Sequence, residues 1–195
     1  MTEREPMSTY RGIRQAFRVL NHSFMISVFR SGLGAWVVSP WAGYIMVLTT
    51  IGHRTGRLRH TPVNYALIDG DVCCIAGFGS VVHWARNLAA VPEAEVQLPA
   101  GRFWGRVQTV TDDQERLRIG RQILKNAGFA GFFFGFSPFT TSDEQLGRGI
   151  AGVPVYRIRP SRAISAVFDP GAAGWIGSTL VWIVVLALVV AVLIH

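Results

Sequence analysis

Residues 175–194 form a predominantly apolar stretch near the C-terminus, with no charged side chain and no proline. At about 1.5 Å per residue, a helix of this length would span about 30 Å, which matches the hydrocarbon core of a bilayer. A buried core helix is the alternative, but a helix that is apolar on every side needs more surrounding protein than the remaining chain offers. We therefore predict a transmembrane helix over 175–194 that anchors the protein to a membrane.

The residues that flank this stretch predict its orientation. Arg157, Arg159 and Arg162 precede it, whereas only His195 follows it. Because basic residues stay preferentially on the cytoplasmic side, we expect a single-pass anchor with the main domain facing the cytoplasm. Residues 161–174 would tether the domain to this anchor. The polar N-terminus is not followed directly by an apolar run, so we expect no signal peptide.

The charge of the chain favours anionic partners. The formal net charge is +7, and all but one of the 19 basic residues are arginines. Arginine forks suit phosphates and carboxylates, which fits membrane lipid, nucleic acid or a polyanionic small molecule. We expect no nucleic-acid partner, because no helix-turn-helix, zinc-finger or RNA-binding motif occurs. No histidine arrangement predicts a metal site. Cys73 and Cys74 are adjacent and would point to opposite faces of a strand, which indicates reduced thiols.

Apolar spacing predicts one amphipathic helix followed by a series of strands. Residues 8–33 place apolar side chains on one face and arginines on the other, so this helix either lies on a membrane or packs on its own domain. It belongs to an N-terminal region over residues 1–40. The strand and helix signals that follow predict strands over 44–51, 59–68, 72–76, 94–98, 102–111 and 153–159, and helices over 83–90 and 112–126. The fold class is therefore mainly β with peripheral α-helices, an antiparallel barrel over residues 41–160 rather than a doubly wound sheet.

A basic turn between the first two strands is the clearest candidate site. It reads Leu-Thr-Thr-Ile-Gly-His-Arg-Thr-Gly-Arg-Leu-Arg-His-Thr-Pro over residues 48–62, with three arginines within six positions. Backbone N–H groups of a glycine turn, threonine hydroxyls and arginine forks suit an oxyanion. An exposed basic hairpin without a ligand is the alternative. Dinucleotide, P-loop and serine-elbow motifs are absent.

Three motifs together resemble the deazaflavin (F420)-dependent nitroreductase family, which includes F420H2-dependent quinone reductases. The basic turn is similar to the family pattern LTTxGRxTGxxRxxPL. Asp69-Gly70-Asp71 with the following strand and Gly77-Phe78-Gly79 resembles the family's turn, strand and cofactor loop, and residues 83–92 resemble its WxxNLxxNP segment. The resemblance covers roughly residues 41–159. It implies an FMN-binding-like split β-barrel that binds F420, a flavin-like cofactor with a phosphate and a polyglutamate tail.

Carried over by position, the resemblance implies the cofactor-binding residues. The phosphate and tail region would be lined by His53, Arg54 and Thr55. The strand beneath the cofactor would contribute Arg59, His60, Thr61, Pro62, Val63 and Asn64. The deazaflavin ring would be approached by the backbone of Ala76, Gly77, Phe78 and Gly79. The helix that closes the site would contribute His83, Trp84, Ala85, Arg86 and Asn87. Trp84 is either a core aromatic or a ring beside the cofactor, and the resemblance favours the second.

The chain departs from the family pattern at several positions. His53 stands where the family often has arginine or lysine, and no lysine lies near Phe78 and Gly79. The substrate-contacting tyrosine of the family has no clear counterpart in residues 129–136, a phenylalanine-rich run that forms either a core lid or an apolar surface. We therefore name no catalytic residue.

The resulting functional hypothesis is a reductase that uses F420H2. It would transfer a hydride from reduced deazaflavin to an apolar acceptor such as a quinone or a nitro compound, and the membrane anchor favours a quinone. An FMN-dependent split-barrel oxidoreductase is the first alternative. A non-catalytic, membrane-tethered F420-binding protein is the second. The sequence leaves a homodimer open.

Overall fold

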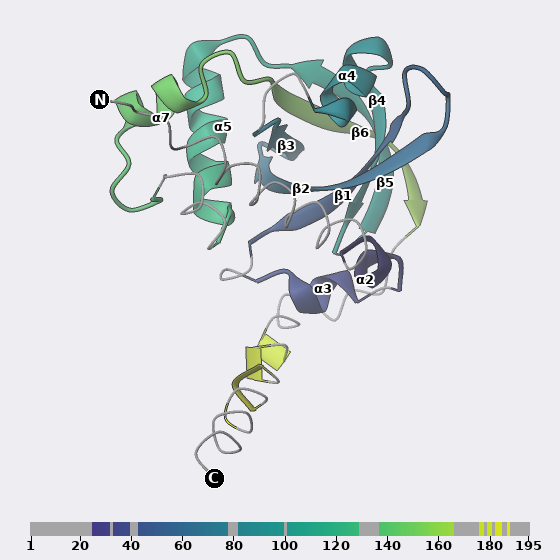
Figure 1. Ribbon diagram of the computed structural model, residues 1–195, viewed down its shortest axis with the longest axis vertical. Coiled ribbons are helices and arrows are strands. Elements are labelled where there is room, and N and C mark those ends of the chain that lie inside the picture. The colour runs from purple at the N-terminus through teal and green to yellow at the C-terminus, as the bar shows by residue number, and fades with distance from the viewer. Residues whose placement is uncertain are drawn as a thin grey trace, which may run out of the picture.

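A six-stranded antiparallel barrel forms the body of the molecule (Figure 1). The computed structural model describes residues 25–31, 33–39, 43–77, 82–99, 101–128 and 137–165, and in the C-terminal segment 176–177, 179–180, 182–184 and 187. The barrel closes in the order β1-β2-β3-β6-β5-β4. Its strands are β1 (Ile45–Ile51), β2 (Leu58–Ile68), β3 (Asp71–Ile75), β4 (Glu93–Leu98), β5 (Gly101–Thr109) and β6 (Val155–Ser165). The predicted mainly β barrel with peripheral helices is confirmed.

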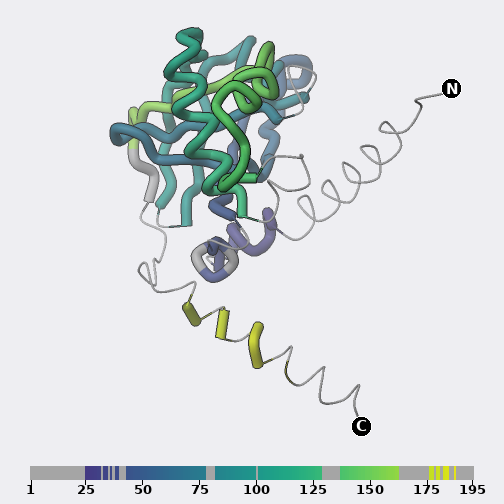
Figure 2. The backbone as a smooth tube through the Cα atoms, turned by 90° about the vertical axis from the view of Figure 1, so that its left-hand side faces the viewer, coloured from purple at the N-terminus to yellow at the C-terminus, as the bar shows by residue number. Residues whose placement is uncertain are grey.

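Short helices cover the outside of this barrel (Figures 1 and 2). They are α2 (Ile26–Arg30), α3 (Gly34–Val37), α4 (His83–Ala90), α5 (Asp113–Asn126) and α7 (Asp143–Gly149). α5 packs on β2, β3 and α7, whereas α4 contacts β1. The corner formed by α2 and α3 lies where the chain enters β1, and α4 lies towards the opposite end of that strand (Figure 1).

The strands are buried because side chains from all six of them fill the interior. Met46 and Leu48 of β1 face Val96 of β4, Val72 of β3 and other members of one apolar cluster, and all four are at most 1% exposed. Alternate residues of β1 face outwards, where Val47 packs against α2. Coverage of both faces explains why the whole centre of β1 is apolar or hydroxylated rather than alternating with charge.

Two local signals in the sequence led to correct element boundaries. Asp69 and Gly70 have φ angles of 54° and 83°, as a two-residue hairpin turn between β2 and β3 requires. The Asp112 carboxylate accepts a hydrogen bond of 2.8 Å from the backbone N–H of Glu115 and so caps α5. Such caps satisfy N–H groups that the helix itself leaves without a partner.

The structure differs from the prediction at the end of the barrel. β6 continues to Ser165, so residues 161–165 belong to the barrel and not to the tether. Pro160 did not end the strand because residues beyond Ile158 pair with β5 alone, and a proline N–H is not needed at an edge. α7 was not predicted, although Ser142 and Gln145 form a complete capping box at its start.

The terminal predictions fall mostly on residues that the structure does not describe. Of the helix expected over 8–33, the described part contains α2, and residues 1–24 lie outside the described residues. In the predicted span over 175–194, the described positions are helical. Within the described residues, no helix reaches the length and apolarity that crossing a bilayer requires. The transmembrane helix therefore stays a prediction.

Candidate cofactor site

The basic turn joins β1 to β2, and backbone hydrogen bonds within the turn close it into a loop. The N–H groups of Thr55 and Gly56 both donate to the Gly52 carbonyl, at 3.1 and 2.8 Å, and Gly52 in turn donates to the Arg57 carbonyl at 2.9 Å. Gly56 has a φ of 64°, which favours glycine at this position. The expectation that backbone N–H groups of this turn would bind an oxyanion is therefore wrong for Thr55 and Gly56. The arginine side chains of the turn are therefore its main candidate groups for binding an anion.

A buried amide of α4 fixes the position of this turn. The Asn87 side chain is 3% exposed, and its Oδ1 atom accepts from the backbone N–H of His53 at 3.0 Å and contacts His53 Nδ1 at 2.8 Å. Its Nδ2 atom donates to the Thr50 hydroxyl at 2.9 Å. Because the protein engages both ends of the amide, Asn87 positions the turn rather than offering a free group to a ligand. Thr50 was absent from the predicted site.

The same contacts define the tautomer of His53. The backbone N–H of His53 donates to the Asn87 atom that also contacts the His53 ring, so this atom is the amide oxygen. An amide oxygen only accepts hydrogen bonds, and the ring nitrogen beside it must therefore carry a proton. Nδ1 is therefore the protonated nitrogen of the neutral ring, and Nε2 remains for a ligand. The exposed ring of His53 would accept a hydrogen bond through Nε2 when neutral and would donate one when protonated.

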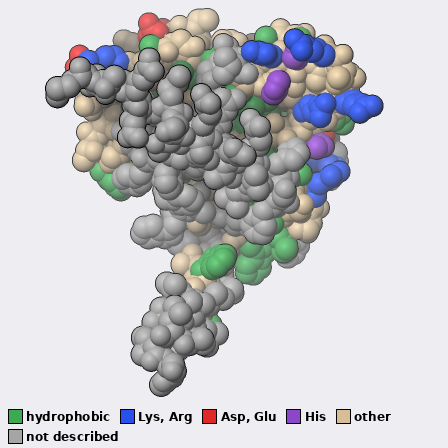
Figure 3. All heavy atoms as spheres, in the orientation of Figure 1, with side chains coloured by type: hydrophobic (Ala, Val, Ile, Leu, Met, Phe, Trp, Pro, Cys, Tyr) green, Lys and Arg blue, Asp and Glu red, His purple; other side chains and the backbone are tan. Residues whose placement is uncertain are grey.

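Some arginines of the barrel are paired with carboxylates: Arg118 of α5 lies 2.7 Å from Asp69, and Arg157 of β6 lies 3.0 Å from Asp71. Others, such as the exposed Arg106 of β5 and Arg162 of β6, have no described acidic partner. Likewise, no described carboxylate lies within ion-pair distance of four exposed arginines around the turn and α4, namely Arg54, Arg57, Arg59 and Arg86. Figure 3 shows basic and histidine side chains gathered on this part of the surface. Four cations without a described acidic partner suit a ligand with several negative charges.

The residues of β2 that were predicted to bind the cofactor do not all point to the same side of the strand. Successive strand residues point to opposite faces, and Val63 pairs with Met46 on the inner face, where both belong to the apolar core. Arg59 and Thr61 share that face, whereas His60, Pro62 and Asn64 face outwards. The outward side chain of Asn64 donates to the Tyr44 carbonyl at 3.3 Å, at the end of β2 away from the turn.

His60 lies in a basic corner of the outer face. Its Nδ1 atom is 2.9 Å from the Thr49 hydroxyl across the β1–β2 pair. Partial burial lowers the pKa of His60, the charge of Arg30 lowers it further, and Glu95 opposes both effects. His60 is therefore held towards its neutral form, and its neighbour Arg30, which sequence reasoning missed, comes from α2.

A third group of predicted residues belongs to the barrel interior. Val63, Ala76, Trp84 and Ala85 all lie in the main core cluster and are at most 8% exposed. The Trp84 ring packs on Tyr156 with centroids 5.5 Å apart, which places it as a core aromatic. The backbone N–H of Ala76 donates to the Pro154 carbonyl at 3.0 Å. Phe78 and Gly79 lie outside the described residues, as does the phenylalanine-rich run over 129–136.

The two cysteines take no part in this site. Both are free and buried, as the sequence predicts for reduced thiols. Burial raises the pKa of Cys73 to about 11 and raises that of Cys74 as well. Both groups are therefore protonated at neutral pH and poor nucleophiles. Among the described residues, no cluster of histidine, cysteine or acidic side chains could hold a metal ion.

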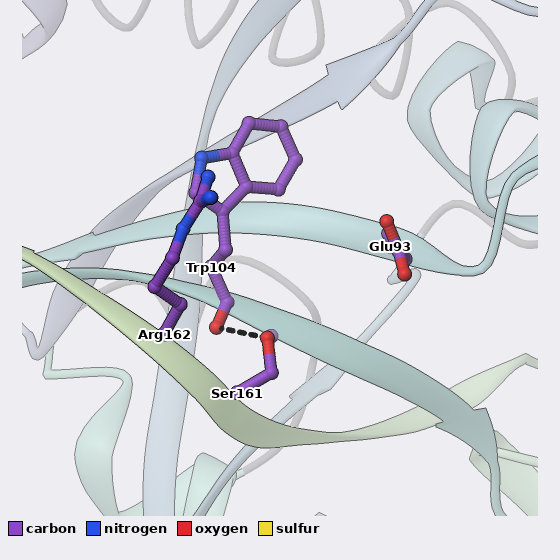
Figure 4. A pocket seen from close by; sticks show the side chains of 5 residues that line it. Glu93, Trp104, Ser161 and Arg162 are labelled. Atoms are coloured by element: carbon purple, nitrogen blue, oxygen red, sulfur yellow. Dashed lines mark hydrogen bonds between the residues drawn. The ribbon is translucent and has the colours of Figure 1, made fainter.

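A separate shallow pocket of about 260 Å³ lies on the outer face, over β4, β5 and β6. Glu93, Trp104, Ser161 and Arg162 line it, and the Ser161 hydroxyl donates to the Trp104 carbonyl at 2.9 Å (Figure 4). The Arg162 guanidinium lies beside the Trp104 indole in this view. None of these residues belongs to the predicted site.

The sequence of the chain matches a known protein family. Residues 25–131, more than half of the chain, match the model of the F420H(2)-dependent quinone reductase family. The chain belongs to this family. The match contains α2, the basic turn and α4, and it confirms the resemblance seen in the sequence. No curated protein matches the chain.

Several solved structures are similar to the chain at low sequence identity and with TM-scores below 0.5. A conserved hypothetical protein from Mycobacterium tuberculosis is 18% identical with a TM-score of 0.48, over 62% of this chain and 75% of its own. The heme storage protein HutZ from Vibrio cholerae is 16% identical with a TM-score of 0.46, over 72% and 91% of the two chains. An F420-H2 dependent reductase, FDR-A, is 18% identical with a TM-score of 0.42, over 59% and 93%.

Proposed function

We propose that this chain is a membrane-anchored reductase that binds F420H2 at the turn–α4 corner, the site formed by the basic turn and the start of α4. It would reduce an apolar acceptor, with a quinone preferred. Membership of the F420H2-dependent family supports the cofactor class. The observation that carries the proposal is the set of four exposed arginines without described acidic partners, because the phosphate and the polyglutamate tail of F420 bring several negative charges.

The residues of this corner fit the cofactor through the chemistry of their donors. Arg54, Arg57 and Arg59 present forked donors suited to phosphate and carboxylate groups, and Arg86 adds a fourth from α4. Asn87 would hold the turn that carries the first two in place. When bound, reduced F420 supplies the hydride. The protein would bind and orient the reactants, and we assign no proton donor.

The anchor belongs to the same proposal. The described side chains of the C-terminal segment include Ile176, Leu180, Trp182 and Val184, which are 47%, 58%, 69% and 58% exposed. Large apolar side chains left this exposed favour a lipid environment over water. A bilayer-bound protein would meet lipid-soluble quinones directly, which is why we prefer a quinone over a nitro compound.

Turnover by the full chain in detergent tests the proposal. F420H2 is mixed with menadione or with a nitroimidazole, and its oxidation is followed by the absorbance of oxidised deazaflavin. We expect protein-dependent oxidation with menadione. If F420H2 binds but no acceptor oxidises it, the reductase proposal fails and the non-catalytic F420-binding alternative replaces it.

A further inference from the structure

We infer that the α2–α3 corner is a second membrane contact: Leu33 and Trp36 enter the headgroup region of the bilayer beside the first turn of the C-terminal helix. The occupant of this surface is lipid, not a second protein. The inference rests on the proposed anchor over 175–194 and adds to it a fixed orientation of the barrel.

The corner is attached firmly to the barrel. Phe29 of α2 is 1% exposed and packs with Val38 and Val47 in a small apolar cluster. A Cβ atom on Gly34 would lie only 2.9 Å from the Phe29 ring, so α3 packs closely on α2. The side chain of Gln97 on β4 donates to the Phe29 carbonyl at 2.7 Å. A membrane contact made here would therefore orient the whole barrel.

The corner also touches the segment that we expect to enter the membrane. A Cβ atom on Gly177 would lie 2.7 Å from the Trp36 ring, so the indole packs directly on the backbone of the C-terminal helix. Gly177 is the third residue of the predicted span, within its first turn. If that turn lies at the bilayer surface, Trp36 lies at the same depth, where tryptophan is enriched.

The exposed side chains of the corner suit the interface chemically. Leu33 is 52% exposed and Trp36 39%, and Ile176 continues this apolar surface onto the C-terminal helix. Arg30 ends α2 beside them and is exposed. The sequence holds no acidic residue between Glu5 and Asp69, so nothing on the corner itself repels anionic headgroups. Figure 3 shows apolar side chains at the base of the barrel, next to the C-terminal segment.

This orientation keeps the basic turn away from the lipid surface. β1 begins next to the α2–α3 cluster and ends at the turn, and six strand residues at about 3.4 Å each separate these ends by about 20 Å. That distance is more than two Debye lengths at physiological salt, about 8 Å each. A polyanionic ligand at the turn is then hardly repelled by anionic lipid, and the arginines stay available to it.

Leu33, the residue before α3, and Leu58, at the turn end of β2, provide a matched pair of probes. Leu33 and Leu58 are both 52% exposed, and the native cysteines, Cys73 and Cys74, are fully buried. An environment-sensitive fluorophore is attached to Leu33→Cys or to Leu58→Cys in the full chain, which is reconstituted in vesicles of phosphatidylcholine and phosphatidylglycerol. Quenchers are carried by the lipid at headgroup depth.

We expect the probe at position 33 to emit at shorter wavelength and to be quenched several-fold more than the probe at position 58. A second change, Trp36→Glu, should reduce the quenching at position 33 without releasing the protein from vesicles. Flotation of the same samples separates the two proposals. Protein that floats with water-like emission at position 33, or with equal quenching at both positions, overturns the corner contact alone. Protein that does not float overturns the anchor and this contact with it.

Discussion

Asn87→Ala tests whether a buried amide holds the cofactor turn. The substitution removes three hydrogen bonds of 2.8–3.0 Å. In two of them Asn87 accepts from the backbone N–H and the ring N–H of His53, and in the third it donates to the Thr50 hydroxyl. Thr50 is fully buried, so its hydroxyl cannot find water instead, whereas His53 is exposed and can. At about 1 kcal/mol for each bond, the free energy of unfolding should fall by about 2–3 kcal/mol.

The same change should weaken F420 binding. Two of the three bonds tie the turn that carries Arg54 to α4, and a ligand must restore that geometry when it binds. At about 1 kcal/mol each, their loss raises the Kd for F420 by up to about thirty-fold. Denaturant unfolding of the full chain in detergent gives the first quantity, and titration of protein fluorescence with F420 gives the second.

Gln122→Ala is the matched control for this prediction. It also removes a helix amide with one hydrogen bond, to Asn126 at 3.1 Å, but on α5. We expect a loss of at most about 1 kcal/mol in stability and an unchanged Kd for F420. If Asn87→Ala lowers stability while F420 affinity stays the same, the turn does not depend on Asn87 for binding. If stability also stays the same, the contacts do not hold the turn at all.

Three further predictions follow from individual contacts. Arg54→Ala should weaken F420 about ten-fold through the loss of a charge-assisted hydrogen bond, whereas Arg148→Ala, an exposed arginine already beside a glutamate, should leave titrations unchanged; equal effects would remove the special role of the turn. The pKa of His60 is lowered on folding from its ordinary value of 6.5, so the unfolded chain binds the proton first and stability should decline as pH falls below about 6.5. His60→Gln should make the melting temperature less dependent on pH between 7.5 and 5.5, and an unchanged pH dependence would contradict this. In denaturant unfolding, Gly34→Ala should lower the free energy of unfolding by about 1–3 kcal/mol because the added methyl group meets the Phe29 ring, whereas Gly147→Ala, in open space on α7, should be neutral or stabilising. Similar values for both variants would refute the close α2–α3 packing.

Local signals allowed the barrel to be predicted from the sequence. The Asp69-Gly70 pair requires positive φ angles that place β2 and β3 in a hairpin, and Asp112 marks the start of α5. Where a local signal was overridden, tertiary pairing was the reason. Pro160 is a usual strand breaker, but β6 continues past it because only one neighbour pairs with it there.

The candidate site was less accessible to sequence reasoning than the fold. The motif residues were recognisable, but the contact between Asn87 and His53 joins positions 34 residues apart through the closure of the barrel. Strand alternation could have separated His60 from Arg59 in advance, since neighbours in a strand face opposite sides. The pairing of Arg118 and Arg157 with acids, which the turn arginines lack, depends on which strands become neighbours.

Parallel titration of the full chain with F420 and with FMN tests the central claim that the turn–α4 corner binds a polyanionic deazaflavin. The measurement is repeated at about 0.05 M and about 0.5 M salt, because screening weakens exposed charge pairs. We predict that F420 binds more tightly than FMN at low salt and that its affinity falls more steeply as salt rises. Tighter binding of FMN, or F420 binding that salt does not change, would contradict the account.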